Sequence, residues 1–586
     1  MNRLSALGRL VRQPLLWVSL SSMSALVIGG ATYAAAPSQP GRVAADLVET
    51  AEEDMAIDKG PVLVDYGTGP VRLSVDGQLQ GGPVALPAQS RSPAPDNGGP
   101  EAHLLGAFGP VFTWPVIPIH AVLLPDGRVI TYGTDLTGVQ GAKLYYVVWD
   151  PTLGVGSDAI MTLPNTTDTS IFCAGQGLIP SSGELLIVGG DTPDAWNRRN
   201  YGVADVNRFN PGSNSLVRQG QSMQYRRWYA SVITMATGEQ VVLGGRVDRA
   251  AAATNRGAPR TENVYASTPE VFSPTTGWRT LTGATSEAAY GAMGANYNYP
   301  RAWLAPNGKI FVLGNNERMF SLDTSGSGSL QTFKERVPRG MPKIPSVMFE
   351  PGRILSVRSG AKAVVIDING DTPVVTPTGS LSQHRENGMA VLLADGQVMV
   401  SGGSSGGNVL EGAAYRVELW NSGTGTWRLG AEHAKPRLYH STALLLADGT
   451  VFTGGGGAQG PVNNLNGQIF YPPYLFKKDG SGDFAPRPEI VSAPTRQLAW
   501  GESFGVTLAP GTSVSRVTLV RTGAATHSFN TEQRFEALPF KQVSDRLRLT
   551  VPADRNMLPP GYYILFVFDA DGVPSVGRVV RLNDGA

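Results

Sequence analysis

A short strand–turn–strand pattern recurs along the middle of the chain, and this repetition restricts the fold more than any other feature. Each copy has an apolar strand, a tight glycine-containing turn and a second strand that usually ends near Gly-Gly. The copies are VLLPDGRVITYG (122–133), GLIPSSGELLIVGG (177–190), ITMATGEQVVLGG (233–245), WLAPNGKIFVLG (303–314), VMFEPGRILSVRSG (347–360), VLLADGQVMVSGG (391–403) and LLLADGTVFTGGGG (444–457). Their turn glycines, from Gly127 to Gly449, lie 44 to 70 residues apart, a period typical of kelch-type propeller blades. We therefore predict a seven-bladed β-propeller over residues 101–485.

Further strands complete a predicted all-β fold. Segments such as YYVVWDP, VNRFNP, EVFSPTTGW, FSLD and VELWNSGTGTW follow the repeats and predict the outer blade strands. From residue 486 the pattern changes to short alternating strands, for example ESFGVTLAP and SRVTLVR, with turns about every ten residues. This pattern predicts an immunoglobulin-like β-sandwich over residues 486–586.

The N-terminal region predicts export. Arg3, Arg9 and Arg12 precede a long uncharged, largely apolar run that ends in Ala-Ala-Ala, which is typical of a secretory signal peptide over residues 1–36. An uncleaved membrane anchor is the alternative, because the run is long enough to span a bilayer. Residues 37–100 form an extension with a short amphipathic helix expected near 46–59 and a Pro/Gly-rich linker at 87–100. We expect a secreted or cell-surface monomer that meets a membrane only if the segment stays uncleaved.

Composition excludes several classes of protein. Lys and Arg number 48 against 47 Asp and Glu, a net charge of +1, so the excess of cations that nucleic-acid binding requires is missing. There is one cysteine, Cys173, so neither an intrachain disulfide framework nor a zinc site with several thiolates is possible. A lone thiol in an exported protein requires an explanation.

Cys173, Tyr229 and the pair Tyr439–His440 hold equivalent places, each directly before the first strand of a repeat. Taken singly, each is most simply a packed structural residue, and we give that interpretation to His103, His120, His384 and His433. Equivalent positions in successive blades, however, face the same end of a propeller axis, so these residues should converge. Imidazole nitrogens with phenol oxygens suit Cu(II) better than zinc or magnesium.

Five motifs in chain order carry a family resemblance. FCAG (Cys173), RWYAS (Tyr229), RLYHS (Tyr439 and His440), ATHSFNTEQR (His527) and the terminal LPPGYYILFVFDADGVPSVGRVVRL all fit. At these residues the chain resembles the galactose oxidase and glyoxal oxidase family of mononuclear copper-radical oxidases, in which a kelch propeller precedes an immunoglobulin-like domain. The resemblance covers nearly all of the chain after about residue 101.

The resemblance implies a site and a reaction. His440 and His527 would be imidazole ligands of one copper ion, with Tyr439 as axial and Tyr229 as equatorial phenol. Cys173 would be joined to Tyr229 by a thioether bond, which makes the pair a protein-derived radical cofactor. Tyr229, Cys173 and Tyr439 would then be catalytic, and a primary alcohol or small aldehyde would be oxidised by dioxygen, with release of hydrogen peroxide.

Two departures bear on the substrate, which could be a small alcohol, an aldehyde or a carbohydrate. Galactose oxidase has a tryptophan after the Gly-Gly of the third repeat, where this chain has Val247 by count, and its sugar-binding arginine has Tyr297 in its place. We therefore expect a glyoxal oxidase-like preference. Arg246, Tyr297, Tyr299 and Arg301 are candidates for the substrate rim, although ordinary blade-edge roles would explain them equally well. The alternative function is a catalytically inactive, carbohydrate-binding adhesive propeller.

Overall fold

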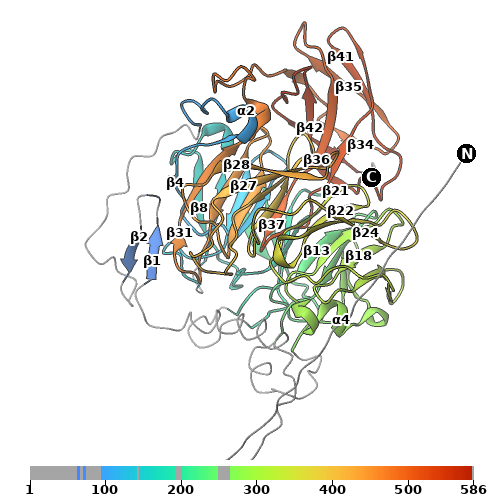
Figure 1. The fold of residues 1–586 in the computed structure, drawn as a ribbon. Coiled ribbons are helices and arrows are strands. Elements are labelled where there is room, and N and C mark those ends of the chain that lie inside the picture. The colour runs from blue at the N-terminus through green and yellow to red at the C-terminus, as the bar shows by residue number, and fades with distance from the viewer. Residues whose placement is uncertain are drawn as a thin grey trace, which may run out of the picture. The chain divides into compact units, whose positions relative to one another are not determined.

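The computed structural model describes residues 62–65, 67, 70–73, 94–140, 144–192, 201–247 and 264–583. The expected signal peptide or anchor (1–36) and the amphipathic helix (46–59) lie outside these residues. The regular secondary structure of the described residues is almost wholly β-strand, with short helices such as α2 (Ala102–Leu105) and α4 (Glu287–Tyr290), so the all-β prediction is confirmed (Figure 1). In this part of the chain no helix is long and apolar enough to cross a membrane.

Each repeat supplies the first two strands of a four-stranded antiparallel run. The first three runs are β5 (His120–Leu123), β6 (Val129–Tyr132), β7 (Tyr145–Trp149), β8 (Ile160–Pro164); β9 (Gly175–Leu178), β10 (Leu185–Val188), β11 (Val206–Asn210), β12 (Ser215–Arg218); and β13 (Ser231–Thr234), β14 (Gln240–Leu243), β15 (Glu270–Ser273), β16 (Gly277–Thr280). The next three are β17 (Arg301–Leu304), β18 (Ile310–Leu313), β19 (Met319–Asp323), β20 (Ser329–Thr332); β21 (Ser346–Glu350), β22 (Arg353–Val357), β23 (Ala363–Asp367), β24 (Val374–Thr378); and β25 (Met389–Leu392), β26 (Val398–Ser401), β27 (Arg416–Asn421), β28 (Thr426–Glu432).

The last repeat completes its sheet with a strand from the other end of the chain. It forms β29 (Ser441–Leu445), β30 (Val451–Gly455) and β32 (Asn466–Tyr471), and β32 then pairs with β3 (Ala107–Phe108) and β4 (Phe112–Thr113). This ladder ties the start of the repeats to their end. Nothing in the sequence pattern predicted it, because β3 has only two residues.

The first strands of the repeats lie next to one another. β9 contacts β13, β13 contacts β17, β21 contacts β25, β25 contacts β29 and β29 contacts β5. These strands are buried along nearly their whole length, whereas fourth strands such as β24 and β28 are partly exposed. Strands buried on both faces are typically rich in apolar residues, which fits the apolar runs in the repeats.

Buried ion pairs hold the segments that enter two of these strands. Arg227 pairs with Glu270 at 2.8 Å, and Arg385 pairs with Glu418 at 2.8 Å, with every partner at most 2% exposed. The Glu270 carboxylate also accepts hydrogen bonds from the backbone of Gln224 and Tyr225. Glu270 therefore fixes the chain just before Tyr229.

Replacing Glu270 by alanine should destabilise the protein strongly. The change leaves the buried Arg227 guanidinium without its carboxylate, and breaking a buried pair in this way costs about 3–5 kcal/mol. Urea unfolding of the variant measures the loss. Lys477→Ala is the control, because the Lys477–Asp483 pair is solvent-exposed and its loss should leave the midpoint unchanged. Equal effects of the two changes would contradict the role of Glu270.

The C-terminal region forms two facing sheets. One contains β33 (Ile490–Ser492), β35 (Ser503–Leu508), β41 (Arg546–Thr550) and β40 (Phe540–Val543). The other contains β34 (Gln497–Leu498), β43 (Arg578–Leu582), β42 (Gly561–Phe568), β36 (Arg516–Arg521) and β39 (Phe535–Ala537). Their apolar side chains share one core, which includes Leu519, Leu549 and Leu565. This arrangement is that of the predicted β-sandwich.

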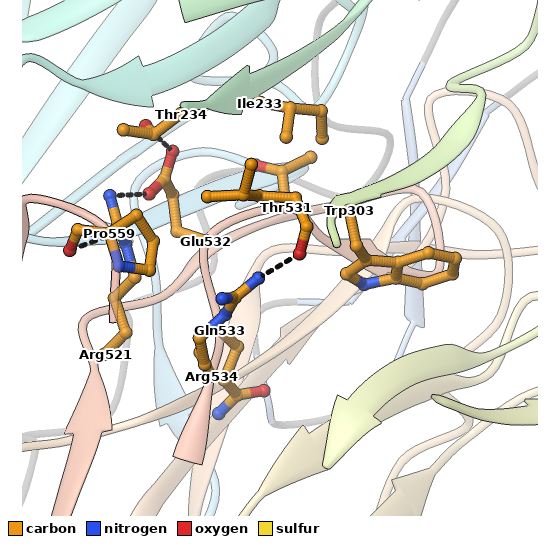
Figure 2. A pocket seen from close by; sticks show the side chains of 10 residues that line it. Ile233, Thr234, Trp303, Arg521, Thr531, Glu532, Gln533, Arg534 and Pro559 are labelled. Carbon is orange, nitrogen blue, oxygen red and sulfur yellow. Dashed lines mark hydrogen bonds and ion pairs between the residues drawn. The ribbon is translucent and has the colours of Figure 1, made fainter. Parts of the chain in front are cut away.

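A hairpin from the C-terminal region is inserted among the first strands of the repeats. β37 (Ala524–Thr526) pairs with β5, and β38 (Phe529–Asn530) pairs with β21. The residues that follow anchor it. Glu532 accepts a 2.8 Å hydrogen bond from Thr234 and is paired with Arg521 (Figure 2). Gln533 bonds the backbone of Leu392 through both ends of its amide. The hairpin is thus held from several repeats at once.

The N-terminal extension contributes a small sheet of its own. β1 (Val62–Asp65) pairs with β2 (Pro70–Leu73) and, in parallel, with β31 (Asn463–Asn464) of the last repeat. The Asp65 carboxylate lies 2.8 Å from the Lys435 ammonium. The extension is therefore attached to the loop that follows β30.

Candidate metal centre

In six of the repeats, a residue one to three positions before the first strand has a left-handed backbone. These residues are Cys173 (φ 54°), Tyr229 (74°), Tyr299 (41°), Lys343 (64°), Asn387 (64°) and His440 (64°). Non-glycine residues adopt positive φ rarely and at a cost, and such strain gathers at functional sites. All six are buried. The residues that the sequence suggested to be equivalent therefore share a backbone conformation.

The Gly-Gly ends of the repeats hold these entry segments in place. Gly403 donates its N–H to the Arg437 carbonyl at 2.7 Å, two residues before Tyr439. A Cβ atom on Gly402 (φ 64°) would lie 2.4 Å from the same carbonyl oxygen, so only glycine allows this approach. The glycines of one repeat thus position the site residues of the next.

His527 occupies the two-residue turn of the inserted hairpin. It and Ser528 have φ of 44° and 62°, between the paired residues Thr526 and Phe529. Positive φ at both central positions is the pattern of a type I′ turn, which normally contains Asn or Gly. Arg301 donates to the His527 carbonyl at 3.1 Å, and the Tyr299 ring stacks on the imidazole at 4.5 Å. Histidine is therefore held in an unfavourable conformation by its surroundings.

Both imidazoles present Nε2 to the same space. His440 donates its Nδ1 proton to the Gly457 carbonyl at 2.7 Å, and His527 Nδ1 lies 2.6 Å from the Thr526 hydroxyl oxygen. The Nε2 atoms lie 3.7 and 3.4 Å from Cys173 Sγ. Burial lowers the pKa of each imidazole well below its usual value. Both rings are therefore neutral, the form that binds a metal ion.

The two phenols and the thiol complete the cluster. The hydroxyl oxygens of Tyr229 and Tyr439 are 2.5 Å apart, and the Tyr229 N–H donates to the Cys173 carbonyl at 3.0 Å. Donor atoms of Cys173, His440 and His527 all lie within 4.8 Å of one another. The structure thus brings together all five residues singled out for the site, from four separate parts of the chain.

An indole covers Tyr229. The Trp228 ring stacks on it at 3.9 Å with an interplanar angle of 22°, and the Arg246 guanidinium lies 5.2 Å from the Trp228 ring. Val247, which sequence counting put in the place of the family's tryptophan, is buried, and its N–H donates to the Val264 carbonyl. The tryptophan that stacks on Tyr229 is therefore the residue directly before it in the chain, and not the residue at position 247.

The four rim candidates fall into two groups. Arg246 donates to the Tyr297 hydroxyl at 2.9 Å, and its guanidinium lies 5.2 Å from the rings of both Tyr297 and Trp228. The first pair is therefore next to Trp228. Tyr299 donates its hydroxyl proton to the Ala174 carbonyl, and Arg301 bonds the backbone of Tyr299 and His527. The second pair therefore contacts the His527 turn.

Sequence reasoning missed Trp228, Lys343 and His120 as neighbours of the cluster, and Asn387 as the residue of positive φ in the sixth repeat. Lys343 and Asn387 could have been found by applying the equivalence rule to the fifth and sixth repeats as well. His120 is buried, its ring stacks on Tyr132 at 4.4 Å and lies 5.9 Å from that of His527, and burial lowers its pKa to about 3. No signal in the sequence distinguishes His120 from a structural histidine.

Known proteins resemble this chain in both sequence and fold. Residues 487–582 match the family model "Galactose oxidase-like, Early set domain". A galactose oxidase of Gibberella zeae is 29% identical over 82% of this chain and 71% of its own length. The aldehyde oxidase GLOX of Vitis pseudoreticulata is 27% identical over 73% of this chain and 85% of its own.

A solved structure extends the likeness to the fold. It is a fungal alcohol oxidase of the AA5 family in complex with copper, with a TM-score of 0.69 and 25% identity, covering 82% of this chain and all of that one. The chain therefore has a galactose oxidase-like fold with an early-set, immunoglobulin-like domain. It is a homologue of the galactose oxidases and of the GLOX aldehyde oxidases, and the resemblance inferred from its motifs is confirmed.

Proposed function

We propose that the protein is a copper-radical oxidase that converts a primary alcohol or small aldehyde to an aldehyde or carboxylic acid and reduces dioxygen to hydrogen peroxide. One observation carries the proposal: two neutral imidazoles, two phenols 2.5 Å apart and a thiol converge in one buried cluster. The homology to oxidases of galactose and of aldehydes supports it.

The donor set fits copper. Both Nδ1 atoms have hydrogen-bond partners that orient the rings, so Nε2 is left as the donor on each, and second-shell contacts of this kind are typical of metal-binding histidines. Two nitrogens and two oxygens suit Cu(II). His440, His527, Tyr229 and Tyr439 would hold the ion. When bound, copper would supply a one-electron store and polarise the substrate oxygen.

Cys173 and Tyr229 would form the second one-electron store. Oxidative coupling removes one hydrogen from the thiol and one from the Tyr229 ring, with dioxygen as the acceptor, and leaves a thioether. The ortho sulfur delocalises an unpaired electron, so the cross-linked ring is more easily oxidised. The stack of Trp228 on Tyr229 shields this ring from solvent.

In the proposed reaction the substrate loses two electrons and two protons. Tyr439 would accept the proton from the hydroxyl of the alcohol or of the hydrated aldehyde, and the Tyr229 radical would take the hydrogen atom bound to carbon. The remaining electron would go to the one-electron store that copper supplies when bound, which leaves a carbonyl product. Dioxygen receives the two electrons and two protons and leaves as hydrogen peroxide. The 2.5 Å separation of the phenol oxygens allows one bound substrate to meet both groups.

We propose small aldehydes and alcohols as substrates, as for glyoxal oxidases, with Arg246 and Tyr297 at the rim. Tyr299 and Arg301 fit better as supports of the His527 turn, since their contacts go to its ring and backbone. The same proposal includes a seven-bladed propeller over residues 101–485, a sandwich over residues 486–586, secretion and a monomeric state.

Exposure to copper and oxygen should alter the mass of the protein. Coupling of Cys173 to Tyr229 removes two hydrogens, about 2 Da, and Cys173 then resists alkylation after denaturation. Intact-mass spectrometry measures both changes, and peroxide release is assayed with a panel of aldehydes and primary alcohols. Protein kept under argon with copper is the control. An unchanged mass, an alkylatable thiol and no peroxide would favour the adhesive alternative.

A further inference from the structure

The two phenols at the site have very different neighbours. Their hydroxyl oxygens are 2.5 Å apart, so an electron could be removed from either ring. Oxidation of Tyr229 gives a radical on the ring that carries the thioether. Oxidation of Tyr439 would instead inactivate the group that accepts the substrate proton. The proposed reaction therefore requires the two rings to differ in how easily they lose an electron.

Lys343 faces Tyr439. Its ammonium nitrogen lies 3.9 Å from the centroid of the Tyr439 ring, within the range of a cation–π interaction. The residue is 5% exposed and has a φ of 64°, and its carbonyl accepts the Asn387 N–H at 2.8 Å. Lys343 is thus a fixed, buried cation that enters the site from the fifth repeat, at the place where other repeats provide Cys173, Tyr229 and His440.

The ring stacked on Tyr229 is instead the neutral indole of Trp228, at 3.9 Å. The Arg246 cation lies one layer further away, 5.2 Å from the Trp228 ring. The two phenols therefore differ in local charge: a cation contacts Tyr439, and an electron-rich aromatic ring contacts Tyr229.

A cation over a ring stabilises its electrons and opposes their removal. The effect is large where solvent is excluded, because water no longer screens the charge. A stacked indole carries no charge that opposes oxidation, and its π system can delocalise the unpaired electron of an oxidised neighbour.

We propose that Lys343 is a positioning residue that confines the radical to Tyr229 by making Tyr439 harder to oxidise. The inference rests on the proposed function, because it assumes that a tyrosine at this site is oxidised. In the oxidation considered, one electron passes from a phenolate ring to hexacyanoferrate(III), which becomes hexacyanoferrate(II), and the phenolate becomes a neutral phenoxyl radical.

The test compares Lys343→Met, which removes the charge at similar volume, with Lys343→Arg, which retains it. Full-length, copper-matured protein is oxidised with hexacyanoferrate(III), and the radical is located by electron paramagnetic resonance after a chelator has removed the copper. A Tyr229 radical couples to one ortho ring proton, because sulfur replaces the other, whereas a Tyr439 radical couples to two.

In the wild type and in Lys343→Arg we expect the one-proton signal alone. In Lys343→Met the share of the two-proton signal should rise on the order of tenfold or more. Copper stoichiometry and circular dichroism monitor the fold, and Lys343→Gln serves as a second neutral variant if the methionine variant does not fold.

Two results would overturn the inference. One is a neutral variant with the wild-type spectrum, and the other is an arginine variant that behaves like the neutral ones. Failure of the proposed function itself looks different, because the wild type would then bind no copper and form no radical at all.

Discussion

Cys173→Ser should lower peroxide production roughly a thousandfold or more while the protein still folds and binds copper. Serine cannot form the thioether, so Tyr229 loses the ortho sulfur that we propose makes its ring oxidisable. The imidazoles and phenols that would hold the ion are unchanged. Three measurements on one preparation test this. The rate with the best aldehyde substrate measures activity, the intact mass shows whether the thioether has formed, and the copper content measures metal binding.

A matched control accounts for the buried hydroxyl that serine introduces. Cys173 is fully buried, and an unsatisfied hydroxyl in such a place costs about 1–3 kcal/mol. Ala390→Ser places a hydroxyl at another buried position on β25, away from the cluster. The control should match the loss of stability and retain activity. If Cys173→Ser kept wild-type turnover, the proposed cofactor would be refuted.

His527→Gly should weaken copper binding strongly and leave the hairpin intact. Glycine adopts the φ of 44° without steric cost and is a preferred residue in type I′ turns, so β37 and β38 should stay paired. Loss of a ligand should exceed the tenfold to hundredfold loss that follows from removing a second-shell partner, so we expect a decrease in copper affinity of more than about a hundredfold. Competition with a chelator of known affinity measures it.

His433→Gly is the control for removing a buried imidazole. His433 bonds the Ser401 hydroxyl at 2.8 Å and packs against the tilted ring of Phe108, apart from the cluster. It should lose stability and retain copper. Undiminished copper affinity in His527→Gly would contradict the ligand set. Deleting residues 487–586 would be a poorer test, because it also removes the ladder partners of β5 and β21.

The repeats and the cluster could be predicted because both depend on local order in the chain. A strand pair with a tight turn is encoded within about a dozen residues, and residues at equivalent places in successive repeats face one common end. Cys173, Tyr229, Tyr439 and His440 followed from this rule alone. His527 did not, since it lies outside the repeats, and only its motif indicated it.

The contacts that depend on tertiary packing could not be predicted from the sequence pattern. β3 has two residues and no pattern of its own, yet it completes the sheet of the last repeat. Trp228 was hidden because the family's tryptophan comes from a different position, and a stack depends on ring orientation, not on spacing. Tyr299 and Arg301 stay rim candidates, and the sequence does not reveal that the His527 turn lies beside them.

By itself the sequence determined the strand pairs, their repetition, the change to a sandwich pattern, and which residues enter each first strand, because these properties depend on short-range turn chemistry and burial. Only the tertiary structure decided what those residues meet: the inserted hairpin that brings His527 to Cys173, the indole on Tyr229 and the ammonium over Tyr439. The first contact joins residues 354 positions apart and the third joins two different repeats, while the stack of Trp228 on its chain neighbour depends on how the two rings are oriented. Their geometry is set by the packing of whole sheets, and no local pattern encodes it.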